Sequence, residues 1–161
     1  MTENKNINIE VYSDGSCNPQ LNIGGWASII LYNQQKIILE GKELNTTHNR
    51  MELLAVINSI KYIFKNLTNF NCIKIYSDSQ YVVRLNERKE KLLMKNFITK
   101  KGNILRNSDL LSELINFMQM PNIEFVKVKA HQKPTQFENY NIEVDKIVRK
   151  IVRDAVSQIN K

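Results

Sequence analysis

Cysteine, proline and glycine are scarce in this chain of 161 residues, and each shortage excludes a class of protein. The two cysteines, Cys17 and Cys72, are too few for a disulfide-stabilised scaffold and lack the paired spacing of a zinc site. With only 5 glycines and 3 prolines, the sequence contains no linker-like or low-complexity tract. We therefore expect one domain over residues 1–161, stabilised by an apolar core.

Long apolar runs are also missing. The first residues, Met1 to Asn8, are polar, whereas a secretory signal has an apolar centre. No run approaches the roughly 20 apolar residues that are needed to cross a bilayer. The sequence therefore predicts a cytoplasmic protein that does not enter a membrane.

Negative charge is in short supply. Lysine and arginine number 23 against 16 aspartates and glutamates, which gives a net charge of +7. This total fits either ordinary surface lysines or a nucleic-acid partner. The distribution favours nucleic acid, because one segment holds eight basic residues opposed only by Glu87 and Glu90: Arg84, Arg88, Lys89, Lys91, Lys95, Lys100, Lys101 and Arg106.

The periodicity of apolar residues predicts the order of secondary structure. Alternation predicts strands at residues 7–12, 26–32, 36–40, 72–76 and 123–128. Helical spacing predicts helices at residues 50–66 (with Thr47 or His48 near the start), at 79–85, from 108 to Pro121, and from about 141 onward. The short polar connection at 33–35 indicates an antiparallel hairpin. Three leading strands followed by alternating helices and strands predict an α/β protein with a mixed sheet covered by helices.

Two segments of the sequence copy each other. Residues 9–14 (IEVYSD) and 73–78 (IKIYSD) each read as a strand with an aspartate at its C-terminal end. If the two strands are parallel neighbours, Asp14 and Asp78 project together at the edge where open α/β sheets bind ligands. Close carboxylates repel each other unless a cation or a proton intervenes. Either aspartate alone would more simply mark the start of a turn, and it is the matched pair that favours a shared site.

Glu52 and Asp145 are two further candidate carboxylates. We expect each in the first turn of a helix, where an acidic residue ordinarily stabilises the helix dipole. Their spacing in the sequence does not by itself bring them to Asp14 and Asp78.

Several ordered motifs closely resemble the signature segments of type 1 ribonuclease H. They are residues 14–17 (DGSC), 24–27 (GGWA), 46–53 (TTHNRMEL) and 77–82 (SDSQYV), with 107–110, 128–131 and 141–146 fitting the same template. The last of these is closer to retroelement versions of the domain. The resemblance covers about residues 7 to 156. It implies a ribonuclease H-like fold, with a five-stranded mixed sheet that begins with three antiparallel strands and is flanked by helices.

The resemblance also implies a chemistry. Asp14, Glu52, Asp78 and Asp145 match four acidic residues that hold two Mg²⁺ ions, with Mn²⁺ as a substitute. Such a site hydrolyses the RNA strand of an RNA–DNA hybrid and leaves a 5′-phosphate and a 3′-hydroxyl. His131, in a lysine-rich loop, matches a histidine that assists proton transfer or product release.

Substrate-binding residues follow from the same resemblance. Cys17, Asn49, Glu52 and Gln80 would line the minor groove of the hybrid, where the 2′-hydroxyls of RNA are exposed. Thr47 and Asn107 match a pocket for a DNA phosphate, and the basic segment would grip the hybrid through Lys89, Lys91 and Lys95. Each has a simpler alternative: a small buried thiol, a helix cap, or a solvated charged face.

The sequence departs from the family pattern at several positions. His48 stands where the family has asparagine, and the Asn-Pro pair in the loop of residues 18–23 is shifted. The basic segment has no tryptophan, because Trp26 is the only one in the chain. Ile142 replaces a glutamate, which makes Glu143 a rival to Asp145 as fourth ligand. We favour Asp145, because residues 144–148 (VDKIV) match the family context.

The sequence fits three other functions less well. A proofreading exonuclease needs a second carboxylate two residues after Asp14, where Ser16 stands. A non-catalytic nucleic-acid-binding domain would have lost at least one of the four carboxylates. A piece of a reverse transcriptase is disfavoured, because the chain begins at Met1 and lacks a polymerase-like region, but these features do not argue against a partner subunit. We expect a free-standing, monomeric enzyme.

Overall fold

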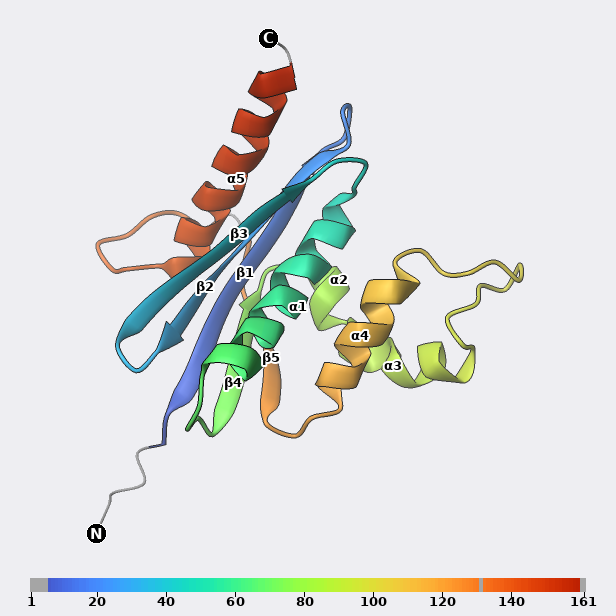
Figure 1. Cartoon of the computed structure of the whole chain (residues 1–161), viewed down its shortest axis with the longest axis horizontal. Helices are drawn as coiled ribbons and strands as arrows, with labels where there is room; N and C mark the ends of the chain where they lie inside the picture. The colour runs from blue at the N-terminus through green and yellow to red at the C-terminus, as the bar shows by residue number, and fades with distance from the viewer. Residues whose placement is uncertain (1–5, 131, 160–161) are drawn as a thin grey trace.

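The computed structural model describes residues 6–130 and 132–159, in which one five-stranded sheet carries helices on its two faces (Figure 1). The strands are β1 (Asn8–Asn18), β2 (Ile23–Tyr32), β3 (Gln35–Glu43), β4 (Cys72–Ser77) and β5 (Ile123–Lys127). The helices are α1 (His48–Asn66), α2 (Gln80–Val83), α3 (Leu85–Met94), α4 (Ser108–Met118) and α5 (Tyr140–Ile159).

The strand order is β3-β2-β1-β4-β5, with β1 at the centre. β1 and β3 run antiparallel to β2, whereas β4 runs parallel to both β1 and β5. The predicted mixed sheet with an antiparallel three-strand start is therefore confirmed. The two copied segments are indeed adjacent, because Ile9 pairs with Ile73 and Ser13 with Ser77.

Two apolar layers hold helices against the opposite faces of the sheet. Successive side chains of a strand point to opposite faces, so Ile9 and Val11 face α1 and α4 while Tyr12 faces α5. The larger layer buries Ile57 of α1 and Leu114 of α4. The smaller layer is formed by Ala27 and Ile29 with Val144 and Val148.

The ends of several elements differ from the sequence predictions. β1 does not end at residue 12 but continues to Asn18, because its antiparallel pairing with β2 extends to Asn18 and Ile23. α1 begins at His48, two residues before the apolar periodicity but at the start expected near Thr47 or His48, because the Thr47 hydroxyl caps it by accepting a hydrogen bond from the Arg50 backbone N–H at 3.2 Å. The periodicity did not predict α3.

Residues 84–106, which we call the arm, project away from the sheet (Figure 1). α3 forms its first part. An antiparallel bridge between Ile98 and Ile104 closes its second part. No helix in the part of the chain that the structure describes is both long and apolar enough to cross a membrane.

Gly15 allows α1 to lie directly against β1. A Cβ atom at this position would lie 2.4 Å from the backbone N of Glu52 and 2.4 Å from the backbone C of Met51. Backbone atoms cannot swing aside as a flexible side chain can, so only glycine fits. This contact fixes the position of Glu52 along β1.

Gly15→Ala should therefore separate α1 from β1 and destabilise the protein. Overpacking of this kind costs about 1–3 kcal/mol or more, which a lower urea midpoint would measure. Ser16→Ala, one residue further along the same strand, is the control and should change the midpoint much less. A Gly15→Ala protein as stable as the wild type would contradict this account of the contact.

Candidate active site

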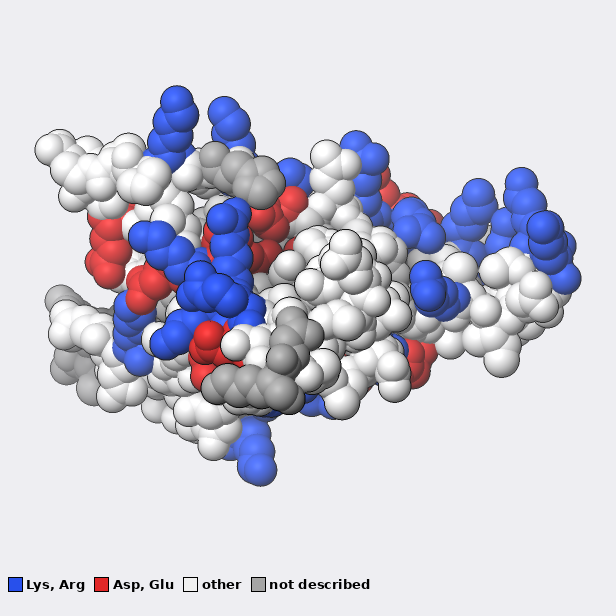
Figure 2. All heavy atoms as spheres, turned by 90° about the horizontal axis from the view of Figure 1, so that it is seen from above, with Lys and Arg blue, Asp and Glu red and all other residues white. Residues whose placement is uncertain are grey.

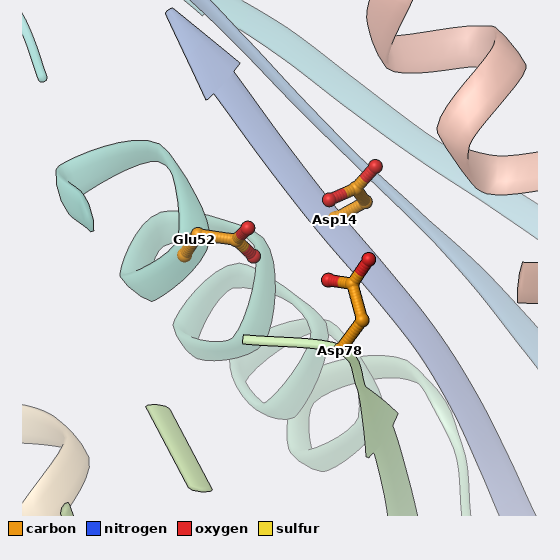
Figure 3. Close-up of side chains that lie close together, drawn as sticks. All are labelled: Asp14, Glu52 and Asp78. Carbon is orange, nitrogen blue, oxygen red and sulfur yellow. The ribbon is translucent and has the colours of Figure 1, made fainter. Parts of the chain in front are cut away.

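Three acidic side chains from different elements converge on one point. Asp14 comes from β1, Glu52 from α1, and Asp78 from the residue that follows β4 (Figure 3). One carboxylate oxygen from each lies within 4.8 Å of the others. The sequence predicted Asp14 at the end of its strand. It lies instead inside β1, at the point where the parallel pairing with β4 stops at Ser13 and Ser77.

Each carboxylate is positioned by its own element. The parallel register of β1 and β4 places Asp14 and Asp78 side by side, each one residue beyond the last pair. Gly15 donates its backbone N–H to Asp14 Oδ1 at 2.9 Å. Glu52 lies in the second turn of α1, not in the first as predicted, because the helix begins earlier. It therefore does not act as a capping residue, and its side chain faces the two aspartates.

The three carboxylates are costly to hold together in the charged state. Asp14 is 7% exposed and Glu52 is 2% exposed. Burial, together with repulsion from Glu52, Asp78 and Asp145, raises the pKa of Asp14 from 3.8 to about 9. Burial and repulsion from Asp78 raise the pKa of Glu52 well above its ordinary value of 4.5. A group of this kind requires protons or a bound cation.

One buried oxygen in this group lacks a partner. Glu52 Oε2 is buried without a hydrogen bond in residues 6–130 and 132–159. Buried polar atoms in native proteins nearly always have a partner, so this oxygen calls for an explanation. A divalent cation held by Asp14, Glu52 and Asp78 would supply the missing interaction. The donor set consists of carboxylate oxygens, which suits a hard cation.

A cavity of about 360 Å³ opens above the three carboxylates. Asn49 and Gln80, two of the predicted substrate-binding residues, line it. Its other polar lining residues include Ser16, His48, Asp145 and Arg149.

Asp145 lines this cavity but lies outside the 4.8 Å group. It occupies the second turn of α5 rather than the predicted first, because the helix begins at Tyr140. Its Oδ2 forms an ion pair with Arg149 Nε at 3.0 Å. Glu143, the rival fourth ligand, pairs with Lys36 instead and is absent from the cavity lining. Of the two, Asp145 is the residue on the cavity wall.

The remaining predicted substrate-binding residues lie outside the cavity. Cys17 Sγ donates to the backbone oxygen of Thr46 at 3.4 Å, next to Thr47. Thr47 caps α1, and Asn107 precedes α4 with a φ of 62°. His131 lies outside the described residues.

Arg50 joins Thr47 and Asn107. Its backbone N–H is capped by Thr47, while its guanidinium donates to Asn107 Oδ1 at 3.5 Å. The same guanidinium makes two hydrogen bonds to Asp109, at 3.1 and 2.9 Å. Sequence reasoning did not single out Arg50, although the structure places it between the two residues of the predicted phosphate pocket.

The surface of the arm is rich in lysine and arginine side chains (Figure 2). Lys91 and Lys95 are exposed and, with Arg88 and Lys100, line a small hollow of about 180 Å³. Lys89 is half-buried and lies outside this hollow.

Arg149 is a residue of the cavity wall that sequence reasoning missed. It stands four residues after Asp145 on a helix, a spacing that places oppositely charged side chains together. That spacing was a usable signal.

Residues 6–153 match the sequence model of the RNase H family. The chain belongs to the ribonuclease H family. It is thus a ribonuclease H hydrolase, and members of this family cleave RNA in RNA–DNA hybrids. The resemblance drawn from the motifs is confirmed.

Similar proteins cover nearly the whole chain. A protein of Wolbachia sp. subsp. Drosophila simulans named Ribonuclease H is 37% identical over 149 residues, which is 91% of this chain and 97% of that one. The Ribonuclease H of Caldicellulosiruptor saccharolyticus is 33% identical over 148 residues, again 91% and 97% of the two chains. The crystal structure of a type 1 RNase H with the type 2 active-site motif superposes with a TM-score of 0.75 and 22% identity, over 92% of this chain and 73% of that one. This last match supports the fold.

The repulsion between the carboxylates predicts how stability changes with pH in the absence of divalent ions. Because the pKa of Asp14 is raised in the folded state, the contribution of Asp14 to folding stability is full below pH 3.8 and is lost as the pH rises toward 9. In EDTA, the urea midpoint of the protein should therefore decrease as the pH rises from about 5 to about 8.

Asp14→Asn should flatten this decline and raise the midpoint in EDTA at the higher pH. Asp154→Asn, an exposed aspartate of α5, is the matched control and should leave the decline unchanged. If Asp14→Asn declines as steeply as the wild type, Asp14 does not bear the repulsion.

Proposed function

We propose that this ribonuclease H is an endonuclease that hydrolyses the RNA strand of RNA–DNA hybrids with two divalent ions. Asp14, Glu52, Asp78 and Asp145 would hold the ions, and the products would carry 5′-phosphate and 3′-hydroxyl ends. The unpartnered, buried Glu52 oxygen beside Asp14 and Asp78 is the observation that carries this proposal. Residues 1–161 would form one catalytic domain that acts as a cytoplasmic monomer.

The residues present fit hard divalent cations. Carboxylate oxygens are the ligands that Mg²⁺ prefers, with Mn²⁺ as a substitute. When bound, the ions would lower the pKa of an attacking water and stabilise the charge on the leaving oxygen. The chain contributes the donors: Asp14, Glu52 and Asp78 each bring a carboxylate oxygen to one point, and Asp14 would serve both ions.

Asp145 occupies the rim of the same cavity. Its ion pair with Arg149 holds its carboxylate at the wall of the cavity. With one oxygen held by the guanidinium, its other oxygen is left to approach an ion. We assign His131 to proton transfer or product release, on the family resemblance alone.

Hybrid recognition would use the cavity wall and its surroundings. Asn49 and Gln80 would meet the 2′-hydroxyls of the RNA strand in the minor groove, with Cys17 farther along. Thr47 and Asn107 would hold a phosphate of the DNA strand. Arg50 supports this assignment, because its backbone N–H binds Thr47, and its guanidinium, which contacts Asn107 and pairs with Asp109, would suit a phosphate.

Cleavage of a labelled hybrid tests the function. With Mg²⁺, the wild type should cut only the RNA strand and leave 5′-phosphate ends. Asp14→Asn should lose at least about 100-fold in rate, as expected when charge stabilisation at the reacting centre is removed. Asp154→Asn should cleave like the wild type. No cleavage by the wild type, or an undiminished rate with Asp14→Asn, would overturn the proposal.

Substitution of Lys89, Lys91 and Lys95 by glutamine should weaken hybrid binding and reduce its salt dependence. Each phosphate contact that is lost should reduce the slope of log K against log salt by about 0.7–0.9. A triple glutamine variant of Lys42, Lys65 and Lys150, three exposed lysines outside the arm, has the same net charge. If both variants show the same slope, the arm lysines make no special contact with the hybrid.

A further inference from the structure

His48 places an imidazole beside the acidic group. It is the first residue of α1, and its side chain lines the same cavity as Asp14, Glu52 and Asp78. Its Nε2 lies 3.4 Å from Glu52 Oε1, because residues four apart share one face of a helix. The two oxygens of Glu52 thus have different surroundings: Oε1 faces the imidazole, whereas Oε2 is buried and unpartnered among the described residues.

The distance between His48 and Glu52 suits two ligands of one cation. With metal–ligand bonds of roughly 2.1 Å, neighbouring donors lie about 3.0 Å apart in octahedral and about 3.4 Å apart in tetrahedral geometry. The observed 3.4 Å equals the tetrahedral spacing and is about 0.4 Å longer than the octahedral one, a difference that needs no movement of the backbone. The His48 side chain is 62% exposed, so its rotation toward an ion meets little steric resistance.

The chemistry of imidazole differs from that of the carboxylates around it. Mg²⁺ prefers oxygen ligands almost exclusively, whereas imidazole nitrogen binds transition-metal ions well. From these contacts we infer that His48 supplies a nitrogen ligand to the cation next to Glu52 and shifts the ion preference of the site from Mg²⁺ toward Mn²⁺ and later transition metals. This inference rests on the proposed function, since it concerns an ion in the same carboxylate site.

The position of His48 limits the inference to one ion. Its nitrogen is not part of the group whose donors all lie within 4.8 Å, and it meets that group on the Glu52 side. It would therefore add one nitrogen at the edge of the group, while Asp14 and Asp78 continue to supply oxygens alone. A simple helical pairing of His48 with Glu52 would produce no contact between nitrogen and metal.

Pulsed electron paramagnetic resonance of bound Mn²⁺ distinguishes these two arrangements. The wild type should show the ¹⁴N coupling of a directly bound imidazole. The chain has 2 histidines, so the matched variants are His48→Asn and His131→Asn. The coupling should disappear in His48→Asn and persist in His131→Asn. Bound Mn²⁺ without imidazole coupling, or a coupling that only His131→Asn removes, would overturn the inference while leaving the proposed function intact.

Calorimetric titration measures the shift in preference directly. His48→Asn should weaken Mn²⁺ binding about 10-fold, within the range seen when groups around a metal site are removed. Mg²⁺ binding should change less than about 2-fold, since oxygen ligands dominate its affinity. Equal losses for the two ions would contradict a nitrogen ligand. If neither ion binds the wild type, the proposed function itself fails, so the two failures are distinguishable.

Discussion

Mutual repulsion among Asp14, Glu52 and Asp78 is the constraint on which the rest of this structure depends. Donor oxygens of the three lie within 4.8 Å, and Asp14 and Glu52 are almost wholly buried. The fold opposes this repulsion with rigid elements: the parallel register of β1 and β4, and the backbone contact of α1 with Gly15. The repulsion lowers the stability of the fold unless a cation or protons reduce it, and such a cost is typical of a functional site.

The sequence was sufficient to predict much of this frame, because its signals were local or repeated. The copied segments at 9–14 and 73–78 predicted adjacent strands, and the structure pairs them residue by residue. Alternation and helical spacing predicted the five strands and most helices. Glu52 could be added only through the ordered family motifs, because no local pattern shows that α1 crosses β1 at Gly15.

The remaining features depend on contacts between distant parts of the chain. β1 extends past Asp14 because β2 continues to pair with it, which the alternation at residues 7–12 does not reveal. Asp145 and Glu143 have different partners, Arg149 and Lys36, and Lys36 lies more than 100 residues away from Glu143 in the sequence. The four-residue spacing of His48 and Glu52 was visible in the sequence. Only the positions of Asp14 and Asp78 show that this spacing brings His48 to the acidic group.

The most direct test of the account is a crystal structure of the protein with Mn²⁺, in which anomalous scattering locates the ions. We expect an anomalous peak coordinated by oxygens of Asp14, Glu52 and Asp78, with Glu52 Oε2 engaged. A map in which this group holds no ion at saturating Mn²⁺, or in which the three carboxylates have moved apart, would contradict it.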